Sequence, residues 1–229
     1  MVGGPRIELA EGRNNLRYLE NLVGVPIRDL QGARDDPVLV SGLRLAFRRL
    51  AGWKAADAEL LEFPELAHDV DRQAVDWTAF FPRSVRDPRP RRVVRCAARP
   101  GEGRSSWVEI LATSSRVEET FVPRVNPATW KALSPEAQRE KLEAMADERT
   151  ARIEVVRESP GELVVQQKDV ERFRLLFTRD DLPEKRPIRM RLGSRSRTLT
   201  VTPAASVLLS EFVERFDRTF LPVGEALLP

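Results

Sequence analysis

The sequence predicts an α+β protein in two parts, a short parallel βαβα segment followed by a mostly antiparallel β-sandwich-like domain. The first observation is that apolar runs before about residue 85 alternate with segments of helical periodicity. The second is that, after about residue 92, runs rich in Val, Ile and Leu follow one another between turn residues. The chain has 229 residues, 41% of them hydrophobic and 32% charged, which is typical of a folded protein.

The first part, residues 1–84, alternates helices with strands. Apolar residues recur at helical spacing between Pro37 and Leu50, and Gly52 is expected to stop that helix. We expect a helix over 11–22, a strand over 26–31, a helix over 37–50, a strand over 59–63 and a helix over 71–80.

A linker over residues 85–92 separates this part from a β-rich domain over residues 93–229, because two prolines stand there among charged residues. Ser134, Pro135 and Glu136 form a helix start, so an inserted helix is predicted to run to about Asp147. A further helix is predicted around 207–215. The predicted strands are 93–98, 106–112, 118–125, 151–157, 162–167, 172–177, 187–192 and 197–202.

An acid and the only histidine follow the two strands of the first part. Asp35 lies just after strand 26–31, and His68 lies just after strand 59–63. A strand–helix–strand unit of this length makes its two strands parallel, so both end at the same edge of the sheet. Open α/β sheets build their sites at that edge. We therefore expect a carboxyl oxygen of Asp35 to lie within about 6 Å of the His68 ring.

A carboxylate beside an imidazole serves a particular chemistry. It accepts the proton on Nδ1, fixes the tautomer of the ring and stabilises the imidazolium that forms. The other ring nitrogen is then able to take a proton from a hydroxyl nucleophile. Asp35 and His68 are therefore the candidate catalytic residues of this chain.

Two stretches of the first part resemble the last quarter of an α/β-hydrolase catalytic domain. They are YLENLVGVPIRDLQGARDDPVLVSG and ELLEFPELAHDVDRQAVDW. The nearest variety is the dienelactone-hydrolase and prolyl-oligopeptidase-like serine esterases. Their Gly-x-x-Asp-x-x-Val pattern is matched by Gly32, Asp35 and Val38, and their base by His68. Family members with a C-terminal β extension resemble the second part through SSWVEI, ARIEVV and DVERFRLLFTRDDL.

The resemblance implies that Asp35 is the triad acid, that His68 is the base and that the reaction cleaves an ester or peptide bond without cofactor or metal. The nucleophile elbow Gly-x-Ser-x-Gly is absent from these residues. In the family's order the serine precedes the acid and the base, so we expect it upstream of Met1 or on another chain. The strand 26–31 also departs from the family, because a central parallel strand is nearly all apolar and this one carries Arg28, Asp29 and Gln31.

Other classes of function have less support in the sequence. One cysteine, Cys96, and one histidine exclude an internal disulfide and a Cys/His metal cluster. We expect no membrane segment, because no apolar run approaches about 20 residues. The arginine-rich stretch 83–104 invites a nucleic-acid reading, which we do not favour because no binding motif accompanies it.

The alternative to a hydrolase part is a non-catalytic binding or interaction module with a degenerate hydrolase-like segment. Two parallel strands and their helices bury too little surface to be stable alone. We therefore expect them to pack on the β domain, on another protomer of a homo-oligomer, or on an amino-terminal hydrolase half.

Overall fold

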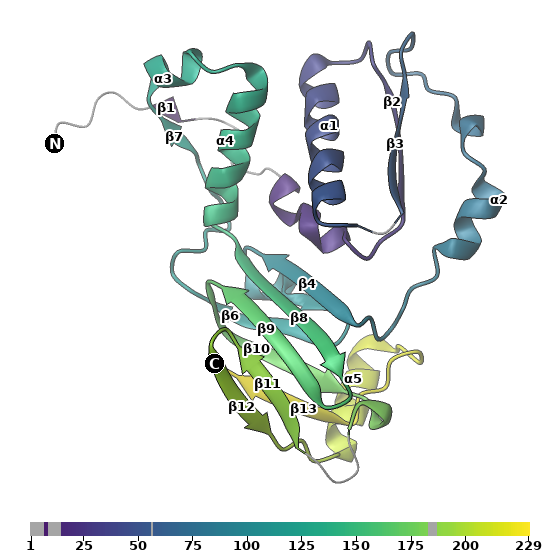
Figure 1. Ribbon diagram of the computed structural model, residues 1–229, viewed down its shortest axis with the longest axis vertical. Coiled ribbons are helices and arrows are strands. Elements are labelled where there is room, and N and C mark those ends of the chain that lie inside the picture. Colours follow the sequence, from purple (N-terminus) through teal and green to yellow (C-terminus); the bar gives the residue numbers. More distant parts are fainter. Residues whose placement is uncertain (1–6, 9–14, 56, 183–186) are drawn as a thin grey trace, which may run out of the picture. The chain divides into compact units, whose positions relative to one another are not determined.

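The computed structural model describes residues 7–8, 15–55, 57–182 and 187–229 (Figure 1). The chain divides into two compact units. Unit 1 comprises Met1–Arg86 and Thr120–Asp147, and unit 2 comprises Asp87–Glu119 and Glu148–Pro229. The first boundary between the units falls within the predicted linker. Among the described residues, no helix is long and apolar enough to cross a membrane.

Unit 1 contains the predicted parallel βαβ segment. Strand β2 (Ile27–Gly32) pairs in parallel with β3 (Ala58–Phe63), and the register runs from Ile27 opposite Ala58 to Gly32 opposite Phe63. Helix α1 (Pro37–Gly52) connects the two strands and lies beside them in Figure 1. The carboxyl ends of both strands therefore meet at one edge, as the sequence predicts.

Local signals explain where α1 begins. The Asp36 side chain caps the helix by accepting a hydrogen bond from the Val38 N–H at 2.7 Å, and Pro37 occupies the first position. Leu50 and Ala46 pack with Leu19 of the 3-10 helix η1 (Asn15–Leu22) in a small apolar cluster. The structure thus has a helix over 15–22, and residues 11–14 of the predicted 11–22 helix lie outside the described residues.

Residues 120–147 belong to unit 1, although the sequence places them in the domain 93–229. They contain β7 (Arg124–Val125), α3 (Pro127–Lys131) and most of α4 (Pro135–Glu148), and β7 pairs with β1 (Ile7–Glu8). The physical reason is ionic: Arg49 of α1 donates to Glu143 and Asp147 of α4, each at 2.7 Å. Figure 1 shows α4 beside α1.

Two elements predicted in these regions differ from the structure. The helix expected over 71–80 forms as the 3-10 helix η2 (Arg72–Ala74) and α2 (Trp77–Phe80), followed by η3 (Phe81–Arg83). Asp71 and Asp76 each accept a hydrogen bond from a backbone N–H, so each starts its own short helix. The strand expected over 118–125 is confined to β7, because Pro123 has no N–H for a ladder.

Unit 2 contains two sheets in a sandwich-like arrangement. One sheet has the order β13-β10-β6-β5, and the other has the order β12-β11-β9-β8-β4. Their pairs are antiparallel except for β11 with β9, which is parallel. The strands are β4 (Arg92–Ala97), β5 (Arg104–Ser105), β6 (Val108–Thr113), β8 (Ala151–Ser159), β9 (Glu162–Lys168), β10 (Val170–Phe177), β11 (Ile188–Leu192), β12 (Arg195–Leu199) and β13 (Gly224–Leu228).

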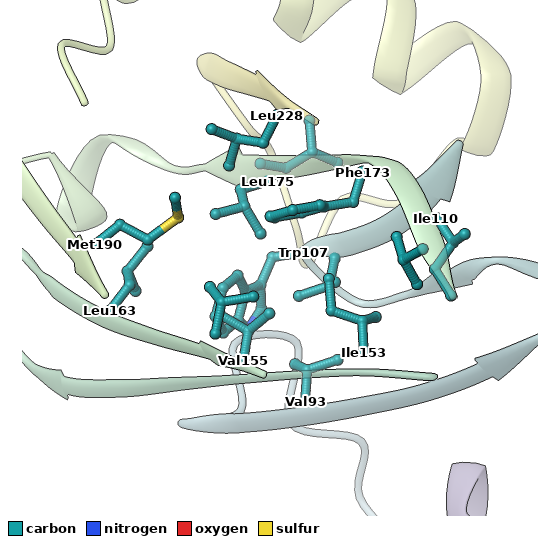
Figure 2. Packing of buried hydrophobic residues seen from close by; sticks show 14 of the residues in the cluster. Val93, Trp107, Ile110, Ile153, Val155, Leu163, Phe173, Leu175, Met190 and Leu228 are labelled. Atoms are coloured by element: carbon teal, nitrogen blue, oxygen red, sulfur yellow. The ribbon is translucent and has the colours of Figure 1, made fainter. Parts of the chain in front are cut away.

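The core of unit 2 lies between these sheets. Figure 2 shows Phe173, Leu175 and Leu228 from one sheet facing Val155 and Ile153 from the other. Trp107 is fully buried among them, and its indole N–H donates to the Pro90 carbonyl at 2.9 Å. Trp107 is thus buried with its one polar atom hydrogen-bonded, as a tryptophan in a hydrophobic core usually is.

The remaining elements described in unit 2 are one α-helix and two short 3-10 helices. Helix α5 (Ala205–Arg215) is close to its prediction, and the short η4 (Pro100–Glu102) and η5 (Arg179–Asp181) were not predicted. The predicted 197–202 strand is shifted to Arg195–Leu199, because the hairpin turn needs only Gly193 and Ser194. Gly193 has φ +57°, a conformation that favours glycine.

Candidate acid–base site

Asp35 and His68 lie together at the carboxyl edge of the β2–β3 sheet. The distance from His68 Nδ1 to Asp35 Oδ2 is 3.1 Å, which is a hydrogen bond. The geometric prediction from the sequence is therefore confirmed. The pair joins two loops that are far apart in the sequence and come from adjacent parallel strands.

The Asp35 carboxylate is held at both of its oxygens. Oδ1 accepts from the Asp36 N–H at 2.7 Å, and Oδ2 accepts from Gln31 Nε2 at 3.1 Å as well as from His68. The Asp36 amide above all, then His68 and Gln31, lower the pKa of Asp35 below its ordinary value, because each hydrogen bond favours the charged form. The acid is thus ionised at neutral pH, and both of its oxygens accept hydrogen bonds.

Backbone hydrogen bonds fix the two loops against each other. The Ala33 N–H donates to the Phe63 carbonyl, and the Arg34 N–H donates to the Leu66 carbonyl, each at 2.9 Å. The Arg34 and Glu65 side chains form an ion pair between the same loops. The loop that carries His68 therefore has a defined path over the end of β2.

Gly32 is the residue that permits this close approach. A Cβ built on Gly32 would lie 1.7 Å from the Ala67 carbonyl oxygen and 2.5 Å from that of Leu66. Both are backbone atoms of the His68 loop, and no side chain fits between them. The glycine of the Gly-x-x-Asp pattern thus has a physical role in this chain, which is to let one loop pass over the other.

The His68 ring faces solvent on its other side. Its side chain is 89% exposed, whereas that of Asp35 is 17% exposed. Within the described part of the chain, no hydroxyl or thiol is within hydrogen-bond distance of the imidazole. The arrangement holds an imidazole by Nδ1 and leaves Nε2 available for a proton transfer to or from a group outside the described residues.

In the sequence, Gln31 stands out only as a polar residue in a strand that is expected to be apolar. The structure shows that its buried amide contacts the acid. The available signal was the spacing of Gln31 and Asp35 around a glycine turn, together with the cost of a buried amide without a partner.

Two other acidic side chains and the single cysteine take part in the local structure. Asp36 caps α1, Asp181 accepts from the Thr178 N–H at 2.8 Å, and Cys96 is buried in β4. No three His, Cys, Asp or Glu side chains of the described ranges gather into a group that could hold a metal.

Four arginines of the stretch 83–104 pair with carboxylates of unit 2. Arg89 pairs with Asp180, Arg92 with Glu154, Arg99 with Glu102 and Glu119, and Arg104 with Glu211. These pairs neutralise much of the charge that the sequence places in this stretch. These four arginines therefore have a structural role within unit 2.

Comparison with known proteins gave no match: no protein family, no curated protein and no solved structure corresponds to this chain.

Proposed function

We propose that this chain supplies the acid and the base of a serine-type α/β-hydrolase that cleaves ester or peptide bonds. The observation that carries the proposal is the hydrogen bond between His68 Nδ1 and Asp35 Oδ2 at the ends of adjacent parallel strands. The resemblance of the flanking residues to hydrolases of the dienelactone-hydrolase and prolyl-oligopeptidase-like type supports the same reading.

In this proposal Asp35 keeps the proton of the neutral ring on Nδ1, so the lone pair is on Nε2. Nε2 takes the proton of a serine hydroxyl as that oxygen attacks the carbonyl carbon of the substrate. The imidazolium that forms is stabilised by the Asp35 carboxylate. It then gives the proton to the leaving alkoxide or amine, and a water molecule repeats the cycle on the acyl-enzyme.

The nucleophile and the oxyanion hole are not assigned to these residues. The sequence has no Gly-x-Ser-x-Gly elbow, and no hydroxyl of the described residues contacts His68. The proposal therefore includes a polypeptide segment or a second chain that brings a serine to Nε2. The exposure of the His68 side chain, 89%, leaves room for that segment.

Ester hydrolysis by the native polypeptide tests the proposal. The protein would be captured from its source cells through a chromosomal affinity tag and assayed with p-nitrophenyl butyrate. We expect His68→Ala to lower kcat/KM by about 1,000-fold, because general acid–base catalysis of this kind contributes 10²–10⁴-fold. Asp69→Asn, next to the base in sequence, is the matched control and is expected to retain activity. Equal activity of wild type and His68→Ala would contradict the proposal.

A second candidate function is a non-catalytic binding module. It is favoured by the solvent-facing His68 ring, which has no hydroxyl partner among the described residues. The same assay separates the two functions, because a binding module would show no hydrolysis that depends on His68.

A further inference from the structure

The buried amide of Gln31 stands directly beside the acid–base pair. Gln31 is in β2, 5% exposed, and one residue before the glycine turn that leads to Asp35. Its Nε2 donates to the Gly32 carbonyl at 2.9 Å and to Asp35 Oδ2 at 3.1 Å. Both hydrogens of the amide are therefore used close to the candidate site.

The chemistry of these partners fixes the orientation of the amide. A backbone carbonyl and an ionised carboxylate are acceptors only, so the NH₂ end of Gln31 has to face them. The two bonds diverge from one nitrogen and hold the side chain at both a backbone and a side-chain atom. The backbone of the glycine turn thus orients the Gln31 amide, and the amide in consequence orients the Asp35 carboxylate.

We propose that Gln31 is a positioning residue of the acid–base pair, which holds the Asp35 carboxylate so that Oδ2 faces His68 Nδ1. The inference rests on the proposed function for its catalytic meaning, although the geometry itself is independent of it. With the Asp36 N–H on Oδ1 and Gln31 on Oδ2, the carboxylate cannot rotate without breaking a bond. A fixed carboxylate in turn fixes the tautomer of the ring.

A purely structural role does not require this residue type. The turn from Gly32 to Asp35 has its own backbone bond, since the Asp35 N–H donates to the Gly32 carbonyl at 3.2 Å. An apolar side chain of similar length would therefore leave that carbonyl with a partner. The buried amide adds the contact with Asp35 and a second hydrogen bond to a carbonyl that already has a partner. A strand residue in this place is otherwise more stable when apolar.

The test uses the single histidine of the chain, whose ring nitrogens give unambiguous ¹⁵N signals. We expect the neutral ring of the wild type to carry its proton mainly on Nδ1. Gln31→Met keeps the shape of the side chain and removes the donor, and we expect it to lower the Nδ1–H fraction by about half. Gln138→Met is the matched control, because Gln138 Nε2 donates to the Trp130 carbonyl in the same unit, away from the pair.

A second variant keeps the proposal falsifiable if Gln31→Met does not fold. Gln31→Glu is nearly isosteric, and its carboxyl group can donate to Asp35 only while protonated. We expect the Nδ1–H fraction of this variant to fall as the new carboxyl group ionises, whereas the wild type changes little. The other charged residues of the two loops are not substituted in any variant; they are Arg34, Asp36, Glu65 and Asp69.

The outcomes separate this inference from the proposed function. A Nδ1–H fraction that is the same in wild type and both Gln31 variants would overturn the positioning role, whatever the chain catalyses. A changed tautomer in a native polypeptide without His68-dependent hydrolysis would confirm the role and overturn the proposed function. If both hold, Gln31→Met should also lower kcat/KM by about tenfold with KM unchanged.

Discussion

At the scale of single residues, the pKa values of Asp29 in β2 and of Asp35 in the following loop shift in opposite directions. The pKa of Asp35 lies below its ordinary value because the Asp36 amide, His68 and Gln31 donate to it. The pKa of Asp29 lies above its ordinary value because burial disfavours its charge. One carboxylate is thus stabilised in its charged form, and the other is stabilised in its neutral form.

The first prediction concerns Asp35 and acid. A lowered folded-state pKa contributes stability that is present above the unfolded value of about 3.9 and is lost as pH falls through the folded value. Asp35→Asn removes this contribution, so the difference in free energy of unfolding between wild type and variant should shrink as pH falls from about 5 to about 2.5. Urea unfolding followed by Trp fluorescence would measure it. A difference that is constant over this range would contradict the ionised pair.

The second prediction concerns Asp29 and has the opposite sign. Its raised pKa means that the fold binds the proton more tightly, so stability is full below about pH 3.9 and is lost as pH rises through the folded-state pKa. Asp29→Asn should therefore stabilise the protein at pH 7 by up to about 1 kcal/mol and have little effect at about pH 3. Urea midpoints at the two pH values would show this. Asp69→Asn, at an exposed position, is the control, and a destabilised Asp29→Asn at pH 7 would show that the strand needs this charge.

At the scale of elements, the loops that follow β2 and β3 pass close to each other at Gly32. Gly32→Ala puts a Cβ where the Ala67 and Leu66 carbonyl oxygens now lie, so the loop that carries His68 has to move. We expect a loss of thermal stability and a lower Nδ1–H fraction of the His68 ring. Circular dichroism melting and ¹⁵N NMR would measure the two effects. Gly24→Ala is the control, because a Cβ on Gly24 meets nothing within 4 Å, and equal behaviour of the two variants would contradict the close approach.

A second prediction at this scale concerns the contact of α1 with α4. Glu143 is 3% exposed, and burial raises the pKa of its carboxyl group. The ion pair with Arg49 acts in the opposite direction and favours the charged carboxylate. Arg49→Met would leave this carboxylate buried without its partner, and we expect a loss of about 2–3 kcal/mol in urea unfolding, somewhat below the 3–5 kcal/mol of a fully buried pair.

The control for this pair is the double variant Arg49→Met with Glu143→Leu, which removes both charges. It should recover most of the lost stability, because two apolar side chains of similar size replace the ion pair. A double variant that is as unstable as Arg49→Met alone would show that the ion pair is not what holds α4 to α1.

Elements with strong local signals could be predicted from the sequence. The periodicity of α1, the helix start at Ser134 and the alternation in β8 and β9 each lead to the structure. Strand β13 could not be predicted, because Gly224–Leu228 has no alternation and becomes a strand only by pairing with β10. The prediction of one helix over 71–80 is wrong because Asp71 and Asp76 each cap a separate short helix.

The same distinction applies to the candidate site. The pairing of Asp35 with His68 follows from topology, because parallel strands bring their ends together. The contact of Gln31 with Asp35 depends on the path of the glycine turn, which the sequence does not specify at the level of a hydrogen bond. A search for acids and bases alone passes over an amide.

At the scale of the whole molecule, the chain forms two units whose segments alternate along the sequence. Unit 1 is interrupted by residues 87–119 of unit 2, and the segment 120–147 returns to unit 1. The returning segment contacts unit 1 through ion pairs between residues about a hundred positions apart, such as Arg49 with Asp147, and composition gives no sign of them. The sandwich core of unit 2, by contrast, is apparent in its Val- and Leu-rich strands.

Labelling with an activity-based probe tests whether Asp35 and His68 serve a serine nucleophile. The native polypeptide, recognised by an antibody against this chain, would be treated with a fluorophosphonate probe, which labels only an activated serine, and then separated by size. We expect the polypeptide recognised by the antibody, or a chain bound to it, to be labelled in the wild type and not in His68→Ala. An antibody-reactive polypeptide that stays unlabelled in the wild type, alone and with its bound chains, would contradict the claim.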